Sequence, residues 1–136
     1  MKKALMMLLW MLVIAPWAMA QDEEAVEDLD QVRYWEMTPP FVTNFGGPGK
    51  MRYIKTEVTL QVNSAQALRD VTYHSPSIRH ALVMLLSKQT VDSVETVAGQ
   101  EVVRQEALQI VQQLMTEEVG EPTVEELLFT SFYVQN

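Results

Sequence analysis

The chain has 136 residues, of which 48% are hydrophobic, no cysteine, and a formal net charge of −8 at pH 7. This length and apolar content favour one globular domain that builds its core without disulfide bonds. Such an acidic chain is a poor candidate for binding nucleic acid or an anionic lipid surface.

The first twenty residues have the features of an export signal. Lys2 and Lys3 precede an apolar run that ends at Pro16, and Ala18 and Ala20 form a small-x-small cleavage pattern. We expect residues 1–20 to be a signal peptide. The alternative is a retained inner-membrane anchor, because the apolar segment reaches the lower limit of about 17 residues that spans a bilayer. Both interpretations place the rest of the chain in the periplasm of a bacterial envelope.

An acidic segment follows. Six of the ten residues in Gln21–Asp30 are Asp or Glu. Blocks of like charge repel one another and stay solvated, so we interpret residues 21–33 as a linker, either a stalk or a solubilising tail. The folded domain is then expected over residues 34–136.

The domain opens with a predicted β-hairpin. Tyr34–Asn44 is strand-like, but Pro39 and Pro40 cannot donate ladder hydrogen bonds, which restricts this segment to a sheet edge or an extended arm. The glycines of residues 44–49 predict a turn. Met51–Val62 alternates between apolar and polar residues, which predicts a strand with one buried and one solvated face.

The middle of the chain is predicted to be helical. Ser64 is a candidate cap for a short helical turn, and Ser75-Pro76 has the pattern of a capping residue followed by proline in the first turn. The helix that Ser75 opens contains an unbroken apolar run, Ala81–Leu86, so we expect it to be buried on most sides. Thr90 is a candidate cap of another short turn, which we expect Gly99 to close.

A long amphipathic helix is predicted over residues 100–118. Its expected apolar stripe consists of Val103, Ala107, Ile110, Val111 and Leu114. Polar side chains occupy the opposite face.

The closing segment, Val124–Gln135, is rich in aromatic and β-branched residues and predicts a strand. Simple alternation places Leu128 and Phe132 on one face and Leu127 and Phe129 on the other. Because neither face is polar, we expect this strand to lie centrally in the sheet, or to offer one face to a partner. The predicted fold class is α+β, with a small antiparallel or mixed sheet packed by helices.

Opposite charges are separated along the sequence. Acidic residues gather just before the last strand, and basic residues gather in the hairpin and the first helices. We predict that a neighbouring copy brings these groups together, although solvated decoration also explains acidic clusters. The candidate interface consists of Arg52, Lys55, Arg79, Glu117, Glu118, Glu121, Glu125 and Glu126.

The sequence shows no pattern of catalytic or metal-binding residues. His74 and His80 are the two histidines, and their spacing matches no zinc motif. Asp70, Ser75 and His80 have the composition of a triad, but no nucleophile-elbow motif surrounds Ser75. We therefore expect no catalytic residue, no metal and no cofactor.

Several short motifs occur in an order and spacing that resemble those of the FliL family of flagellar basal-body proteins. The similarity runs from Tyr34 to Gln135. The matching residues are Pro40-Phe41-Val42-Thr43-Asn44, Arg52-Tyr53-Ile54, Glu57-Val58-Thr59-Leu60, Pro76-Ser77-Ile78-Arg79, Leu85-Leu86-Ser87, Thr90, Gly99 and Leu128-Phe129-Thr130-Ser131-Phe132-Tyr133-Val134-Gln135.

This resemblance implies a stomatin-like periplasmic domain that forms rings beside the flagellar stator and supports swimming and swarming without catalysis. The expected partners are copies of the chain itself, stator and basal-body proteins, and the inner membrane if the N-terminal segment is retained. Family members carry a cytoplasmic tail and a retained anchor, whereas three residues precede the apolar run here. His80 replaces their acidic residue after the helix arginine. The alternatives are a periplasmic small-ligand carrier and a scaffold of a different envelope complex.

Overall fold

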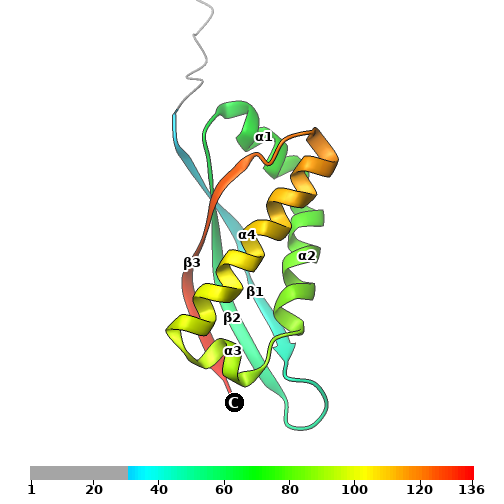
Figure 1. The fold of residues 1–136 in the computed structure, drawn as a ribbon, viewed down its shortest axis with the longest axis vertical. Helices are drawn as coiled ribbons and strands as arrows, with labels where there is room; N and C mark the ends of the chain where they lie inside the picture. The colour runs from blue at the N-terminus through cyan, green and yellow to red at the C-terminus, as the bar shows by residue number, and fades with distance from the viewer. Residues whose placement is uncertain (1–30) are drawn as a thin grey trace, which may run out of the picture.

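The computed structural model describes residues 31–136. The expected signal or anchor, including Ala18 and Ala20, and the six acids of the linker lie outside the described residues. The elements follow one another as β1 (Arg33–Phe45), β2 (Arg52–Val62), α1 (Ala65–Tyr73), α2 (Ser75–Ser87), α3 (Val91–Glu95), α4 (Val97–Val119) and β3 (Val124–Gln135). This arrangement of one three-stranded sheet and four helices in the described part confirms the predicted α+β class (Figure 1).

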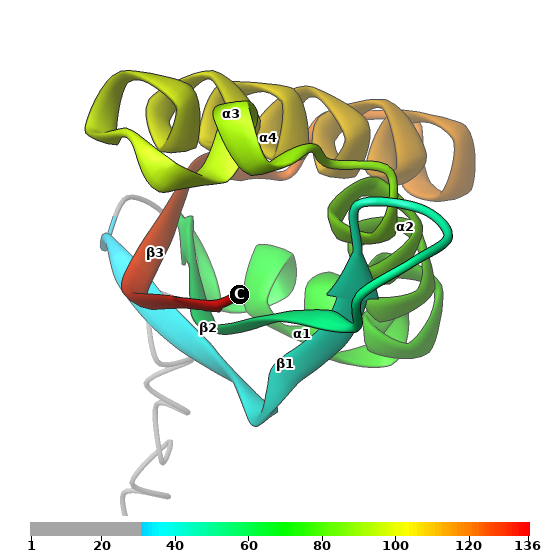
Figure 2. The same cartoon turned by 90° about the horizontal axis from the view of Figure 1, so that it is seen from below.

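All three strands are antiparallel and stand in the order β1-β2-β3. Helices α2 and α4 lie on the same side of the sheet, as the view from below shows (Figure 2). The prediction that the last strand is central was wrong, because β2 holds the middle and β3 forms an edge. Strand β1 carries Pro39 and Pro40, which cannot donate to a ladder, so the chain returning from the helices pairs with the other side of β2.

Strand β1 lies at the opposite edge of the sheet, as its two prolines predict. Its pairing with β2 shifts register between Met37 and Phe41, the interval that contains Pro39 and Pro40. Met37 and Phe41 on either side of the shift are nevertheless both buried. The irregularity therefore removes ladder hydrogen bonds at the prolines while both flanking side chains keep their place in the core.

Strand β3 contains a bulge that corrects the predicted faces. Glu57 pairs with Ser131, but the next β2 residue, Val58, pairs with Phe129, so Thr130 is an extra residue. Phe129 and Phe132 therefore lie on the same face, with ring centroids 5.2 Å apart. Alternation without a bulge predicts that these two residues lie on opposite faces. The inserted residue breaks the period of two and brings them to the same face.

The first two helices begin near the expected residues. The Ser64 hydroxyl accepts a hydrogen bond from the Ala67 amide at 3.0 Å and caps α1. Helix α2 starts at Ser75 itself, with His74 in the capping position, so the expected cap is displaced by one residue. The expectation that α2 is buried on most sides was wrong in one respect, since Met84 is 43% exposed.

Gly99 does not close the short turn as expected. Thr90 does cap α3, through a capping box with Ser93, but Gly99 lies in the first turn of α4 and its amide donates to the Thr96 hydroxyl at 2.9 Å. A Cβ at Gly99 would stand 2.5 Å from the Ser93 carbonyl oxygen. Glycine is required here because α3 and α4 turn sharply against each other.

Helix α4 covers the sheet with a stripe spaced by four residues. Its buried side chains are Val103, Ala107, Val111 and Met115. Ile110 and Leu114, which the sequence also placed in the stripe, are half-buried and pack at its border. The helix ends at Gly120, whose φ of 87° is the left-handed conformation common after helices.

Candidate protein-interaction site

The turn between α4 and β3 gathers the predicted acidic residues at one end of the molecule (Figure 1). Glu117 and Glu118 stand in the last turn of α4, Glu121 follows Gly120, and Glu125 and Glu126 open β3. Two acids accept hydrogen bonds from neutral amides, Glu117 from Gln113 at 3.2 Å and Glu125 from Asn63 at 3.1 Å. Their negative charge is not balanced by these contacts. In addition, His74 Nδ1 lies 3.8 Å from a Glu118 carboxylate oxygen.

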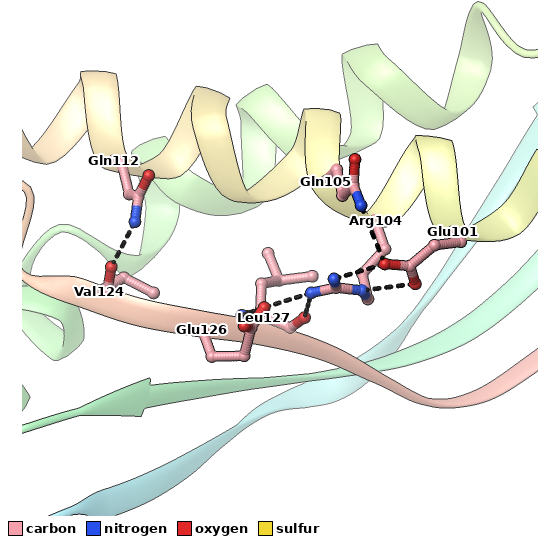
Figure 3. A network of polar contacts seen from close by, with 7 residues as sticks. All are labelled: Glu101, Arg104, Gln105, Gln112, Val124, Glu126 and Leu127. Carbon is pink, nitrogen blue, oxygen red and sulfur yellow. Dashed lines mark hydrogen bonds and ion pairs between the residues drawn. The ribbon is translucent and has the colours of Figure 1, made fainter.

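Glu126 differs from the other acids because Arg104 of α4 binds it (Figure 3). The same guanidinium donates to both carboxylate oxygens of Glu101, at 2.6 and 2.8 Å. It also donates to the Leu127 carbonyl at 3.0 Å. Arg104 thus links one turn of α4 to the Glu126 side chain and to the Leu127 main chain of β3. The planar guanidinium of arginine can donate several hydrogen bonds at once in this way.

The electrostatics of this cluster follow from its hydrogen bonds. The Arg104 guanidinium holds the pKa of Glu101 at about 2, below its ordinary value of 4.5. In turn, the hydrogen bond to Glu101 raises the pKa of Arg104. Both groups therefore stay charged at neutral pH.

A second side chain of α4 bonds to β3 two turns further along. The Gln112 amide donates to the Val124 carbonyl at 2.8 Å (Figure 3). Arg104 and Gln112 are eight residues apart and so face the same side of the helix. Together they occupy main-chain acceptors over the first part of β3.

Sequence analysis missed Arg104 and Gln112 as functional positions. The available signal was that Arg104 is the single basic residue between Val97 and Val119, with Glu101 three residues before it. This spacing predicts a pair within the helix, but it gives no indication that the strand is the second partner.

The predicted basic residues lie elsewhere. Arg52 and Lys55 belong to the hairpin end of β2, whereas Glu126 pairs with Gln61 near the other end of that strand. At 3.3 Å per residue, these two ends are about 30 Å apart. Lys55 is exposed between Val42 and Tyr133 on the side of the sheet away from the core.

Arg79 of α2 binds its own chain. Its guanidinium donates to the Pro39 carbonyl at 2.6 Å and lies 4.2 Å from the centroid of the Phe41 ring. A cation over an aromatic face is attracted by the ring quadrupole. Arg79 therefore fastens α2 to the irregular part of β1. Its proposed role toward a partner stays a prediction, as do those of the other seven interface residues.

Two of the histidine and triad candidates, Asp70 and His74, contact side chains close to them in sequence. Asp70 accepts a hydrogen bond from Gln66 at 2.8 Å, and the His74 ring stands edge-on to Tyr73. Between residues 31 and 136 no group of three or more His, Cys, Asp or Glu residues is placed to hold a metal ion. No helix in this same range has the length and apolar character needed to cross a membrane.

These features define a small α+β domain in which a long helix is bonded to the edge of a three-stranded antiparallel sheet. Residues 34–135 match the family of the flagellar basal body-associated protein FliL. The chain belongs to this family, which confirms the resemblance inferred from sequence. The flagellar protein FliL of Aquifex aeolicus (strain VF5) is 29% identical over 101 residues, which cover 74% of this chain and 60% of that protein. The match thus spans less than two thirds of that relative's length.

Proposed function

We propose that this chain is a non-catalytic, periplasmic component of the flagellar basal body that self-associates next to the stator and supports flagellar rotation, swimming or swarming. The inner membrane holds it there if residues 1–20 are retained. Membership in the FliL family supports the basal-body assignment. The observation that carries self-association is that Arg52 and Lys55 lie at the opposite end of β2 from the acidic residues that open β3.

The separated charges suit a head-to-tail contact between copies. Glu121 and Glu125 are exposed at one end, and Lys55 is exposed toward the other. Lys55 stands six residues along β2 from Gln61, the partner of Glu126, a separation of about 20 Å. This exceeds the Debye length of about 8 Å at physiological salt, so these charges do not neutralise each other within one chain. A head-to-tail contact brings them together, and such contacts close into a ring when the rotation between subunits permits.

Charge reversal at the acidic end tests this contact. The double variant Glu121→Lys/Glu125→Lys leaves Glu126 bound to Arg104, so the fold is preserved while the proposed interface changes sign. We expect a smaller oligomer by light scattering of the full chain at low salt, and restored association when this variant is mixed with Arg52→Glu/Lys55→Glu. The control Glu36→Lys/Glu106→Lys alters net charge equally at exposed positions outside the interface. An unchanged mass in the acidic-end variant contradicts the proposal.

A genetic experiment tests the cellular role. Deletion of the gene is expected to reduce spreading in soft agar and on a swarm plate, and a tagged copy is expected to localise at flagellar bases. Complementation with the Glu121→Lys/Glu125→Lys variant tests whether motility requires self-association of the protein or only its presence in the cell. Full motility in the deletion strain would reject a role in rotation.

A further inference from the structure

The first part of the β3 edge is closed by the protein itself. The Leu127 carbonyl accepts from Arg104, and the Leu127 amide donates to the Glu126 carboxylate at 3.1 Å. The Val124 carbonyl accepts from Gln112. Since an edge strand with free main-chain groups is a template for pairing with another chain, these contacts prevent strand addition over residues 124–127.

The second part of the same edge is open. Leu127 directs its main-chain groups away from β2. In an antiparallel pair this direction recurs at every second residue of the partner strand. The main-chain groups of Phe129, Phe132 and Val134, which pair with Val58, Thr56 and Ile54, therefore also point away from β2. Within residues 31–136 no helix side chain donates to or accepts from these three main-chain positions. The segment Phe129–Gln135, here called the open edge, therefore keeps main-chain groups for a further strand on both sides of the bulge at Thr130, with the regular part at Ser131–Gln135.

Apolar surface continues beside the open edge. Val97 is 85% exposed and precedes Glu101 and Arg104 by four and seven residues, so it lies on the side of α4 that faces this edge. Tyr133 in the open edge is 60% exposed. Val97 belongs to the helix side of the sheet and Tyr133 to the other face, so the open edge has an exposed apolar side chain on each side.

Charge favours a second copy of this chain as the occupant. From Leu127 to Asn136 the sequence contains no charged residue, whereas Glu125 and Glu126 immediately precede it. Two open edges that pair antiparallel about a two-fold axis bring the uncharged segments together and keep the acidic pairs at opposite ends of the ladder. Strand β1 is a poorer partner because of Pro39 and Pro40.

We infer that two copies of the chain pair through Phe129–Gln135 of β3, forming one continuous six-stranded sheet across a two-fold axis. This isologous contact deepens the proposed self-association and rests on it, but it is made by the main-chain edge of β3 and not by the charged side chains, of which Lys55 lies beside Tyr133. Unlike a contact between charged groups, it persists at high salt.

The test compares two residues that occupy the same row of the sheet. Val42 on β1 and Tyr133 on β3 both pair with Lys55, and they are 62% and 60% exposed. Tyr133→Lys and Val42→Lys therefore place the same new charge beside the same lysine, one at the open edge and one at the opposite edge. In about 1 M salt, where the Debye length is about 3 Å and contacts between charged groups are screened, we expect dimers of the full chain that Tyr133→Lys, combined with Ser131→Lys, weakens at least about tenfold, because the apolar Tyr133 ring is lost from the contact. We expect Val42→Lys to leave them intact.

A cysteine cross-link provides a second measurement, because the natural chain has no cysteine. Positions that face each other in an antiparallel ladder have Cβ atoms about 5 Å apart, within reach of a disulfide after small adjustments. Mixing Ser131→Cys with Tyr133→Cys is expected to give covalent dimers under oxidising conditions, and Val42→Cys is expected to give none.

The outcomes are separable. In one outcome, the acidic-end variants lose association, Tyr133→Lys/Ser131→Lys does not change it, and no cross-links form. This outcome overturns the open-edge contact and leaves the proposed function standing. Equal weakening by Val42→Lys and Tyr133→Lys also overturns it, because the face and not the edge would then be responsible. A full chain that stays monomeric at every salt concentration overturns both.

Discussion

The two edges of the sheet are protected against strand addition by different means. The β1 edge is interrupted from within, by Pro39, Pro40 and the register shift that contains them. The β3 edge is covered from outside, by Arg104 and Gln112 of α4, and only over its first part. Protection by proline is present in the strand's own sequence, whereas protection by a helix exists only after the helix has packed. The comparison shows that a strand can be closed along one half and open along the other.

The largest expected effect comes from the β1 edge, at Phe41. This side chain is 1% exposed and supports both the core and the Arg79 guanidinium. Phe41→Ala is expected to lower the free energy of unfolding by about 3–5 kcal/mol, because it removes a buried ring and leaves a cavity. The measurement is urea-induced unfolding. Val42→Ala, at the exposed neighbouring position, is the control, with an expected change within about 0.5 kcal/mol. Equal losses in both variants would mean that β1 is not anchored through Phe41.

A smaller effect is expected at the β3 edge, where Arg104→Ala removes the contacts to Glu101, Glu126 and the Leu127 carbonyl. We expect a loss of about 1–3 kcal/mol in the free energy of unfolding, because partly covered acceptors lose a charged donor. Hydrogen exchange should rise at the start of β3 and remain unchanged in β1.

Two variants sharpen the result. Gln109→Ala lies at an exposed position of the same helix and should be close to neutral. Arg104→Lys keeps the charge but cannot reproduce the bidentate contact with Glu101, so we expect it to recover only part of the loss. Full recovery by lysine would show that charge, and not the guanidinium fork, joins α4 to β3.

The smallest expected effect is a pH dependence of the β3 edge. The folded-state pKa of Glu101 is about 2, below the ordinary 4.5. The stabilisation from its contact with Arg104 is therefore fully present above pH 4.5 and is lost as the pH falls toward 2. We expect the difference in urea midpoint between the natural chain and Glu101→Gln to shrink across this window. A difference that stays constant from neutral pH down to pH 2 would contradict the assigned pair.

The sequence predicted a structural feature correctly where that feature depends on interactions between residues close together in the chain. The alternation of β2, the caps at Ser64 and Thr90, and the edge position of a strand with two prolines were all predicted and confirmed. Gly99 was misplaced because its requirement comes from the Ser93 carbonyl on the preceding helix. The faces of β3 were misassigned because the bulge at Thr130 is visible only in the pairing with β2.

The sequence by itself determined the α+β class and the residues of the hairpin and most caps, because hydrophobic periodicity and turn chemistry act between near neighbours. The family followed from the order and spacing of its motifs. Only the tertiary structure decided that β2 is central, that Arg104 and Gln112 close half of the β3 edge, and that Arg52 and Lys55 lie at the opposite end of β2 from Glu126. Those outcomes depend on which segments meet across 12 or more residues of chain, as the hydrogen bonds from Gln112 to Val124 and from Arg104 to Leu127 illustrate, 12 and 23 residues apart. Periodicity along the chain does not specify such pairings, whereas packing of the core does.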